Sequence, residues 1–355
     1  METTSTKALA ERSRKSLLIR LAILCFAVAV GLLILEGLAR VIYNRNGMHF
    51  GIEMWKYAKY IKRRSSNPAM SHEHTPNSEA FLMGVPVKIN SQGLRDDERD
   101  LAKDPQTYRI LMLGDSITFG WGVRQEETFS KALERMLNEH PLGWPWRRYE
   151  VINTGVGNYN TAQEVAYFME RGFRYRPDMV MLAWFINDAE DTPKPVQGWL
   201  ARESCLYTFV SSAWDDLGRN TRSRPSYKEY YAGLYEDGRE GWAECQRALE
   251  QLSGTCRHEG FELRILLIPE LHSLGADYEF KDIYDKVQRI AERLKVTSLN
   301  LVDAFPTEDP TSFWVSPGDA HPNGRAHAII AEAVYGMLSR ERLPQAVSSD
   351  RERKN

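Results

Sequence analysis

The sequence predicts an α/β fold: a flavodoxin-like, doubly wound parallel sheet of about five strands, preceded by an N-terminal transmembrane helix and a small β-containing extension. Runs of consecutive apolar residues, such as Met179–Ile186, are typical of strands that are buried on both faces. These runs alternate with helical patterns along the chain, which favours a parallel sheet covered by helices. A stretch without charged residues near the N-terminus predicts the membrane helix.

The N-terminal helix is the first predicted element. Leu21–Leu35 has no charged residue, and the apolar stretch reaches back to Leu17 with one arginine inside it. At ~1.5 Å per residue, Leu17–Leu35 makes about 28 Å of helix, enough for a bilayer core of about 30 Å. A cleaved signal peptide is the alternative, but no convincing small-x-small site follows and the helical pattern continues to Tyr43. We therefore expect residues 1–43 to form a cytoplasmic stub and an uncleaved anchor.

The basic residues predict the orientation of this anchor. Five lysines and arginines precede the span and two follow within the next fifteen residues, which favours a cytoplasmic N-terminus. A later basic cluster at 56–64 weakens this asymmetry and fits a surface near lipid headgroups. We expect a single-pass protein of the cytoplasmic (inner) membrane with its body on the extracytoplasmic side.

The segment that follows the anchor, residues 44–106, is expected to be a connector and a small β extension. Residues 44–78 are polar, basic and rich in aromatic side chains, and predict no particular structure. Ala80–Arg95 has short β-like pieces around turn residues, which predicts a small sheet. His72 and His74 are close enough in sequence to share a metal ion, but no other ligand cluster supports such a site, and we expect none.

The main domain is expected at residues 107–342, with a charged tail at 343–355. Thr161 and Glu164 are expected to form a capping box at the start of the second helix. Strands are predicted at 110–113, 149–153, 179–186, 261–268 and 299–302, and helices at 129–137, 161–169, 282–294 and 326–337.

An insertion at residues 189–227 interrupts the alternation of strands and helices. It carries more apolar and aromatic side chains than a solvated loop would. It fits either a satellite packing element or a lid beside the site, and the sequence leaves both open.

Composition narrows the function classes. The chain has 43% apolar and 26% charged residues, as globular proteins do, and its net charge of −2 gives no reason to expect nucleic-acid binding. Four cysteines are no disulfide framework. Cys245 and Cys256 are expected on one helix and too far apart to bond, whereas pairing of Cys205 with either stays open.

A serine follows the first predicted strand of the sheet. Gly114 allows a sharp turn, after which Asp115 and Ser116 lie at the carboxyl end of the strand, where open α/β sheets bind ligands. Acyl transfer by a serine needs a base, a group that orients the base, and donors for the oxyanion. His321 lies in a loop just before the last amphipathic helix, a suitable place for the base.

Two segments offer oxyanion donors. Asn187 ends the third strand, so its side-chain amide is expected at the same sheet edge as Ser116. Gly157 and Asn158 follow the second strand, and either residue tolerates a left-handed backbone that presents an N–H group.

These segments together resemble the SGNH (GDSL-type) hydrolase family over roughly residues 107–340. Ser116 in Gly-Asp-Ser-Ile-Thr matches the family nucleophile, Asn187 in Asn-Asp matches the third sequence block, and His321 before Pro-Asn matches the fifth. Val87–Arg95 and Thr161–Glu164 also look like a membrane-anchored bacterial branch of this family.

The chain departs from the family pattern at three positions. The glycine of the second block falls at Asn158, with Gly157 one position early, and Phe185 replaces the glycine before the third block. Gly318 stands where the family aspartate usually lies, three residues before the histidine. Asp319, two before, would face the same side of an extended segment as His321 and is the expected orienter; Asp303 or a backbone carbonyl is the alternative.

The resemblance implies a serine esterase or deacylase that needs no metal or cofactor. An anchored body outside the membrane suggests, as substrate, ester-linked acyl groups of envelope or exported glycans, and as partner the envelope polysaccharide machinery. The alternatives are an O-acyltransferase of polysaccharide modification, which would use the same residues, and a non-catalytic polysaccharide-assembly module.

Overall fold

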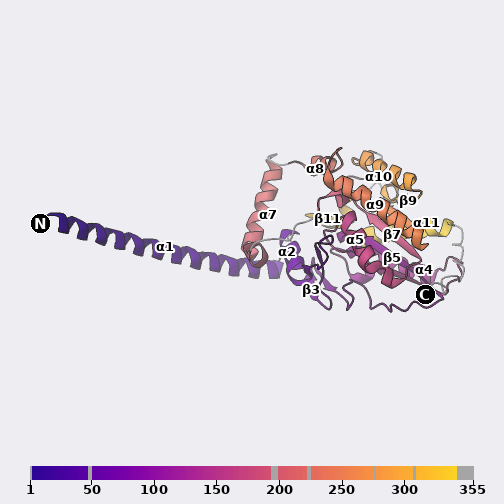
Figure 1. Cartoon of the computed structure of the whole chain (residues 1–355), viewed down its shortest axis with the longest axis horizontal. Helices are drawn as coiled ribbons and strands as arrows, with labels where there is room; N and C mark the ends of the chain where they lie inside the picture. Colours follow the sequence, from indigo (N-terminus) through magenta and orange to yellow (C-terminus); the bar gives the residue numbers. More distant parts are fainter. Residues whose placement is uncertain are drawn as a thin grey trace. The chain divides into compact units, whose positions relative to one another are not determined.

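The computed structural model describes residues 2–46, 50–192, 199–221, 225–275, 277–306 and 309–341. They divide into two compact units, one of residues 1–55 and 197–216 and one of residues 56–196 and 217–355 (Figure 1). The predicted tail at 343–355 lies outside the described residues.

The larger unit is built on a five-stranded parallel sheet. Its strand order is β6-β5-β7-β8-β9, so the second strand along the chain lies at one edge, as in flavodoxin-like folds. The predicted fold class is therefore confirmed. The strands are β5 (Thr107–Gly114), β6 (Arg148–Asn153), β7 (Met179–Trp184), β8 (Glu262–Leu267) and β9 (Thr297–Asn300).

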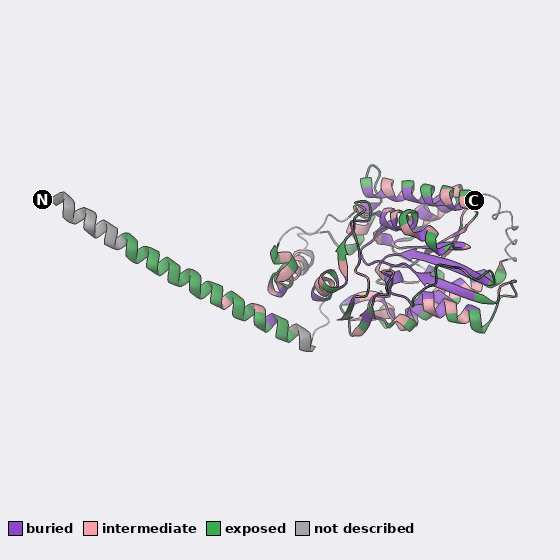
Figure 2. Cartoon of the chain, turned by 60° about the horizontal axis from the view of Figure 1, so that its bottom comes forward, coloured by how far each residue is buried: buried purple, intermediate pink, exposed green. Residues whose placement is uncertain are grey.

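Helices cover both faces of this sheet, because alternate side chains of each strand point to opposite sides. One face packs on α5 (Thr161–Arg171), α9 (Glu240–Glu259) and α10 (Lys281–Leu294). The other face packs on α4 (Phe129–Glu139) and α11 (Gly324–Arg340). The strands consequently form the buried centre of the unit, drawn in purple in Figure 2.

Short elements connect the strands and helices. They include the helices α3 (Ser116–Phe119) and α8 (Tyr227–Leu234), and the antiparallel pair β10 (Trp314–Ser316) and β11 (Asp319–Pro322). The 3-10 helices are η1 (Gln125–Glu127), η2 (Gly172–Tyr175), η3 (Ile186–Ala189), η4 (Val302–Ala304) and η5 (Pro310–Phe313).

The segment before β5 contains two antiparallel strand pairs. β3 (Glu79–Leu82) and β4 (Val85–Lys88) form the small sheet that the sequence predicts. β1 (Lys62–Arg64) and β2 (His72–His74) form a second pair, in a region where the sequence predicts no structure.

The predicted capping box at Thr161 and Glu164 is wrong by one residue, although the helix begins at Thr161 as predicted. Asn160, not Thr161, is the N-cap of α5, and its side chain accepts from the backbone N–H of Gln163 while the Gln163 side chain accepts from the Asn160 N–H. The capping box is therefore Asn160–Gln163. Glu164 is left buried on the inner face of the helix.

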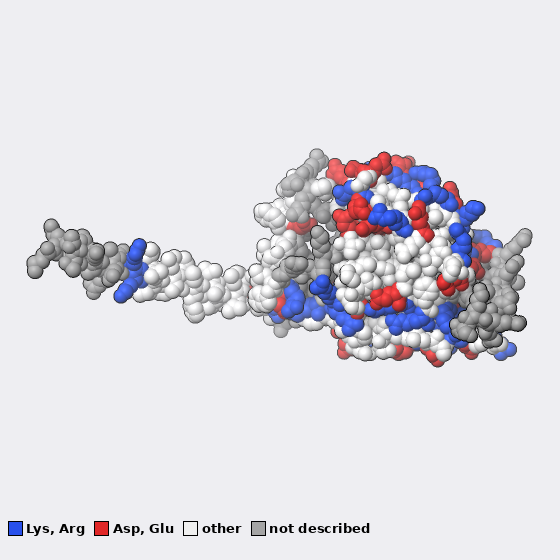
Figure 3. Space-filling model, in the orientation of Figure 1, with Lys and Arg blue, Asp and Glu red and all other residues white. Residues whose placement is uncertain are grey.

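The smaller unit contains the apolar N-terminal helix. α1 (Glu2–Asn46) includes the stretch Arg14–Ile42, which is long and apolar enough to cross a membrane and is exposed along its most apolar part. Figure 3 shows no charged atom along the middle of this helix. The unit also holds the start of α2 (Phe50–Tyr60), α6 (Trp199–Glu203) and most of α7 (Cys205–Asn220).

The insertion predicted at 189–227 is thus divided between the two units. Residues 197–216 group with α1, and Cys205 is buried against Ala39 and Ile52 of that unit. Residues 193–198 and 222–224 lie outside the described residues.

Candidate active site

Ser116 begins α3 just after β5, an interior strand that pairs with both β6 and β7. The turn requires glycine at position 114, because a Cβ there would lie 2.0 Å from Oγ1 of Thr118. Asp115 caps the short helix, with its Oδ1 accepting from the backbone N–H of Ile117 at 2.9 Å. The local sequence therefore holds Ser116 at the carboxyl edge of the sheet, half-buried.

His321 lies on β11 and reaches this serine. Its Nε2 is 2.9 Å from Oγ of Ser116, and its Nδ1 is 2.6 Å from Oδ1 of Asp319. Oδ1 of Asp319 also accepts from the His321 backbone N–H at 3.1 Å, and Oδ2 accepts from the indole N–H of Trp121 at 3.0 Å. The structure thus joins Ser116, His321 and Asp319 in one chain of hydrogen bonds. Asp303, the alternative orienter, is exposed on η4.

The charge on Asp319 determines which ring nitrogen carries the proton. Burial opposes ionisation, but the His321 ring, its backbone N–H and Trp121 outweigh it and lower the pKa of the Asp319 carboxyl. An ionised carboxylate only accepts hydrogen bonds, so Nδ1 of neutral His321 carries the proton and donates it. Nε2 is then the acceptor for the Ser116 hydroxyl.

Asp115 connects the serine to Asn187. Its Oδ2 accepts from Nδ2 of Asn187 at 3.0 Å and lies 3.3 Å from Oγ of Ser116. Burial raises the pKa of the Asp115 carboxyl against the opposing effect of these donors and the nearby His321. Asn187 itself lies on η3, because the apolar run predicted to reach Ile186 as strand turns after Trp184.

The loop after β6 is held by the segment that precedes the sheet. The Gly157 N–H donates to the Tyr57 hydroxyl at 2.8 Å, and Nε2 of His72 lies 3.0 Å from the Gly157 carbonyl oxygen. Asn158 has a left-handed backbone with φ 66°, and its Oδ1 accepts from Nζ of Lys62 at 2.8 Å. Of the two predicted donors, the Gly157 amide is therefore already engaged. The Asn158 amide donates to no acceptor among the described residues.

Sequence reasoning missed Tyr57, Lys62 and His72 as neighbours of the site. Burial and the nearby Lys62 lower the pKa of His72 to about 3, so its ring is neutral, and its Nε2 donates to the Gly157 carbonyl oxygen. Burial also lowers the pKa of Lys62 to about 7. The only sequence signal was the density of basic and aromatic residues between 44 and 78. It does not indicate which residues these side chains contact.

The structure gives no support to a metal ion at His72 and His74. His74 bonds through Nε2 to the Tyr57 hydroxyl at 2.7 Å, and burial lowers its pKa to about 3. Among the described residues, no group of three or more His, Cys, Asp or Glu side chains is arranged to hold a metal.

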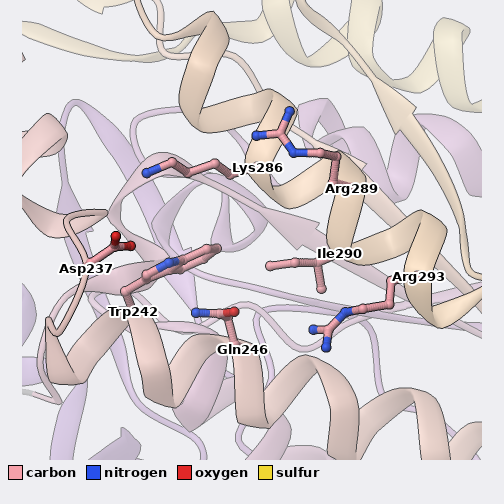
Figure 4. A pocket seen from close by; sticks show the side chains of 7 residues that line it. All are labelled: Asp237, Trp242, Gln246, Lys286, Arg289, Ile290 and Arg293. Atoms are coloured by element: carbon pink, nitrogen blue, oxygen red, sulfur yellow. The ribbon is translucent and has the colours of Figure 1, made fainter.

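A surface hollow of about 320 Å³ lies elsewhere, along α9 and α10 (Figure 4). It includes none of the predicted site residues, so it is not the place of the chemistry described above. Its lining residues are Asp237, Trp242, Gln246, Lys286, Arg289, Ile290 and Arg293.

Comparison with known proteins identifies the family. The model of the GDSL-like Lipase/Acylhydrolase family matches residues 112–329, more than half of the chain. No curated protein sequence matches.

Several solved structures show a distant similarity to this chain. An acetylxylan esterase from Geobacillus stearothermophilus is 17% identical, with 67% of this chain and 97% of that chain covered and a TM-score of 0.43. A lipase/acylhydrolase from Enterococcus faecalis is 14% identical, with coverage of 67% and 100% and a TM-score of 0.41. An α/β hydrolase enzyme from the metagenome of Lake Arreo is 20% identical, with coverage of 65% and 96% and a TM-score of 0.40. Likeness of this degree says nothing about substrate.

Proposed function

The chain belongs to the GDSL-like lipase/acylhydrolase family and is an esterase-type hydrolase of carboxylic esters; we propose that it is a membrane-anchored serine esterase or deacylase acting on ester-linked acyl groups of envelope or exported glycans. The observation that carries the serine mechanism is the position of the Ser116 hydroxyl, 2.9 Å from a His321 ring whose other nitrogen is bound to Asp319. A purely structural assembly module has no need of this arrangement.

In the proposed mechanism Ser116 attacks the ester carbonyl while Nε2 of His321 takes its proton. Asp319 holds the ring in the required tautomer and stabilises the imidazolium that forms. His321 then protonates the leaving alcohol, and a water molecule, deprotonated by the same nitrogen, releases the acyl group from Ser116. All these steps use side chains of the protein and require no cofactor.

For the oxyanion we propose three donors: the backbone N–H of Ser116, Nδ2 of Asn187 and the backbone N–H of Asn158. The choice of Asn158 over Gly157 rests on Tyr57, which already occupies the Gly157 amide. His72 supports the same choice. It binds the carbonyl oxygen of the peptide unit whose N–H belongs to Asn158, and so fixes the direction of that N–H group.

The proposed localisation rests on α1. Its stretch Arg14–Ile42 is suited to crossing a membrane. A signal sequence passes the same test, but the far end of α1 is bonded into the fold: the Glu36 carboxylate accepts hydrogen bonds from Ser204, Cys205 and Leu206. Cleavage on the C-terminal side of Glu36 would remove these bonds, which favours an uncleaved anchor.

The substrate is tested with the full chain reconstituted in lipid vesicles and supplied with O-acetylated polysaccharide. We expect free acetate to appear with the wild-type chain and not with Ser116→Ala. Transfer of the acetyl group to an added glycan acceptor in preference to water would establish the O-acyltransferase instead. Absence of any reaction on acylated glycans, with activity on simple esters retained, would remove the glycan proposal and leave the esterase.

A further inference from the structure

We propose that residues 199–216, comprising α6 and most of α7, form a membrane-interface element whose apolar face lies in the headgroup region of the bilayer. This inference rests on the proposed anchoring by α1. It gives the predicted insertion a role that is neither a packing element of the sheet nor a lid.

The segment is attached to α1 where the apolar stretch ends. The Glu36 carboxylate accepts from the backbone N–H groups of Cys205 at 3.0 Å and Leu206 at 2.9 Å, and from the Ser204 hydroxyl at 2.8 Å. A carboxylate at this position satisfies free N–H groups of the first turn of α7 and complements the helix dipole. Arg40 adds a bond from Nη2 to the Glu203 carbonyl oxygen at 2.7 Å.

The position of Glu36 in the sequence determines the depth of this attachment. The apolar stretch Leu17–Leu35, which is long enough to span the hydrocarbon core, ends just before Glu36, so this carboxylate lies where the chain leaves the core. α7 therefore begins at the membrane surface, where α1 leaves the hydrocarbon core.

One face of α7 is apolar and exposed among the described residues. Tyr207, Val210 and Trp214 are 48%, 55% and 70% exposed, and their spacing of three and four residues places them on the same side of the helix. Trp199 on α6 is 71% exposed. The opposite side carries Cys205, which is 1% exposed.

The bilayer is the occupant that these features indicate. Tyrosine and tryptophan are enriched at membrane–water interfaces, where an apolar ring with a polar group is favoured. Lipid already surrounds the adjoining turns of α1, so no further partner is needed. Residues 199–216 contain one arginine and three acidic residues, so burial of apolar surface, not attraction to anionic lipids, would hold them.

The test uses the full chain in phosphatidylcholine vesicles, with Cys25→Ser to remove the exposed thiol; the other three cysteines are each 1% exposed. An environment-sensitive fluorophore is attached at Val210→Cys, with Ser212→Cys on the opposite face of α7 and Glu332→Cys on an exposed position of α11 as controls. We expect lipids with a spin label near the headgroup to quench the Val210 probe several-fold more than either control, and aqueous iodide to quench the Glu332 probe most.

Equal quenching of the Val210 and Glu332 probes by iodide, with no quenching by lipid, would overturn the inference. Extraction at alkaline pH separates this failure from failure of the anchor, because an unanchored chain would leave the membrane.

The lid alternative is tested by Trp214→Ser, which we expect to leave kcat/KM for a soluble aryl acetate within about twofold of the wild-type value. A large change in that value would also contradict the membrane role.

Discussion

At the scale of single residues, one carboxylate determines the orientation and the tautomer of the His321 ring. Asp319 contacts both the ring Nδ1 and the backbone N–H of His321, so it fixes the position and the tautomer of the ring together. Trp121 binds the other carboxylate oxygen and prevents it from rotating away. In the proposed mechanism, the base for Ser116 is thereby in place before any substrate binds.

Asp319→Asn should lower kcat for aryl acetate hydrolysis on the order of 10³–10⁴-fold, because an amide that donates to Nδ1 favours the wrong tautomer. Circular dichroism should show an intact fold, since the side-chain volume is unchanged. Retention of turnover within a few-fold of wild type would rule out Asp319 as the orienter.

His72 tests the proposed oxyanion donor. His72→Leu should lower kcat by about 10- to 10²-fold with little change in KM, somewhat less than the ~10²–10³ typical of losing a donor outright. His72→Gln can still present an N–H group to the Gly157 carbonyl oxygen and should recover most of the activity. Equal losses in both variants would point to a packing role for His72 alone.

At the scale of elements, Glu164 on α5 and Asp188 on η3 form a buried acidic pair behind the site. Burial raises the pKa values of both carboxyls well above the ordinary range. Repulsion from Asp115 adds to this for both groups, and repulsion from Asp188 adds to it for Glu164. The folded state therefore keeps protons that the unfolded chain releases above pH ~4.5. Their contribution to stability is complete below that pH and is lost as the pH rises toward the folded-state values.

Glu164→Gln should consequently reduce the fall in the free energy of unfolding between pH 4.5 and pH 8. The measurement is urea denaturation of the full chain and the variant in detergent across this range. Comparison of the two proteins isolates Glu164 from the histidines, whose lowered pKa values act in the opposite direction. Parallel stability profiles would show that Glu164 titrates normally in the folded state.

The elements also show what a sequence can predict. Apolar runs and strand-end positions place Ser116 and Asn187 at one sheet edge, because parallel strands present their carboxyl ends together. The proximity of Asp319 to His321 follows from their separation by two residues on the extended strand β11.

Contacts distant in sequence were beyond this reasoning. Tyr57 reaches Gly157 across 100 residues, and no local pattern encodes such a pairing. The apolar run also predicted a strand longer than the observed one. The Asp188 side chain accepts from the Phe185 N–H and closes a turn there, which ends the strand before the apolar run ends.

At the scale of the whole molecule, the topology determines which substrates the enzyme meets. Five basic residues before the apolar stretch and two soon after it favour a cytoplasmic N-terminus. Alkaline phosphatase fused after Asn355 should be active, and a reporter that functions only in the cytoplasm should be silent. The reverse result would place the site in the cytoplasm and remove exported glycans as the substrate.

The central claim is that Ser116 is an activated nucleophile, and covalent labelling tests it most directly. A fluorophosphonate probe should label the purified full-length chain, and Ser116→Ala should abolish both labelling and aryl acetate hydrolysis without loss of stability. The exposed Ser312→Ala serves as the control and should change neither. Failure of the wild-type chain to react with the probe and to hydrolyse activated esters, or labelling that persists in Ser116→Ala, would contradict the account.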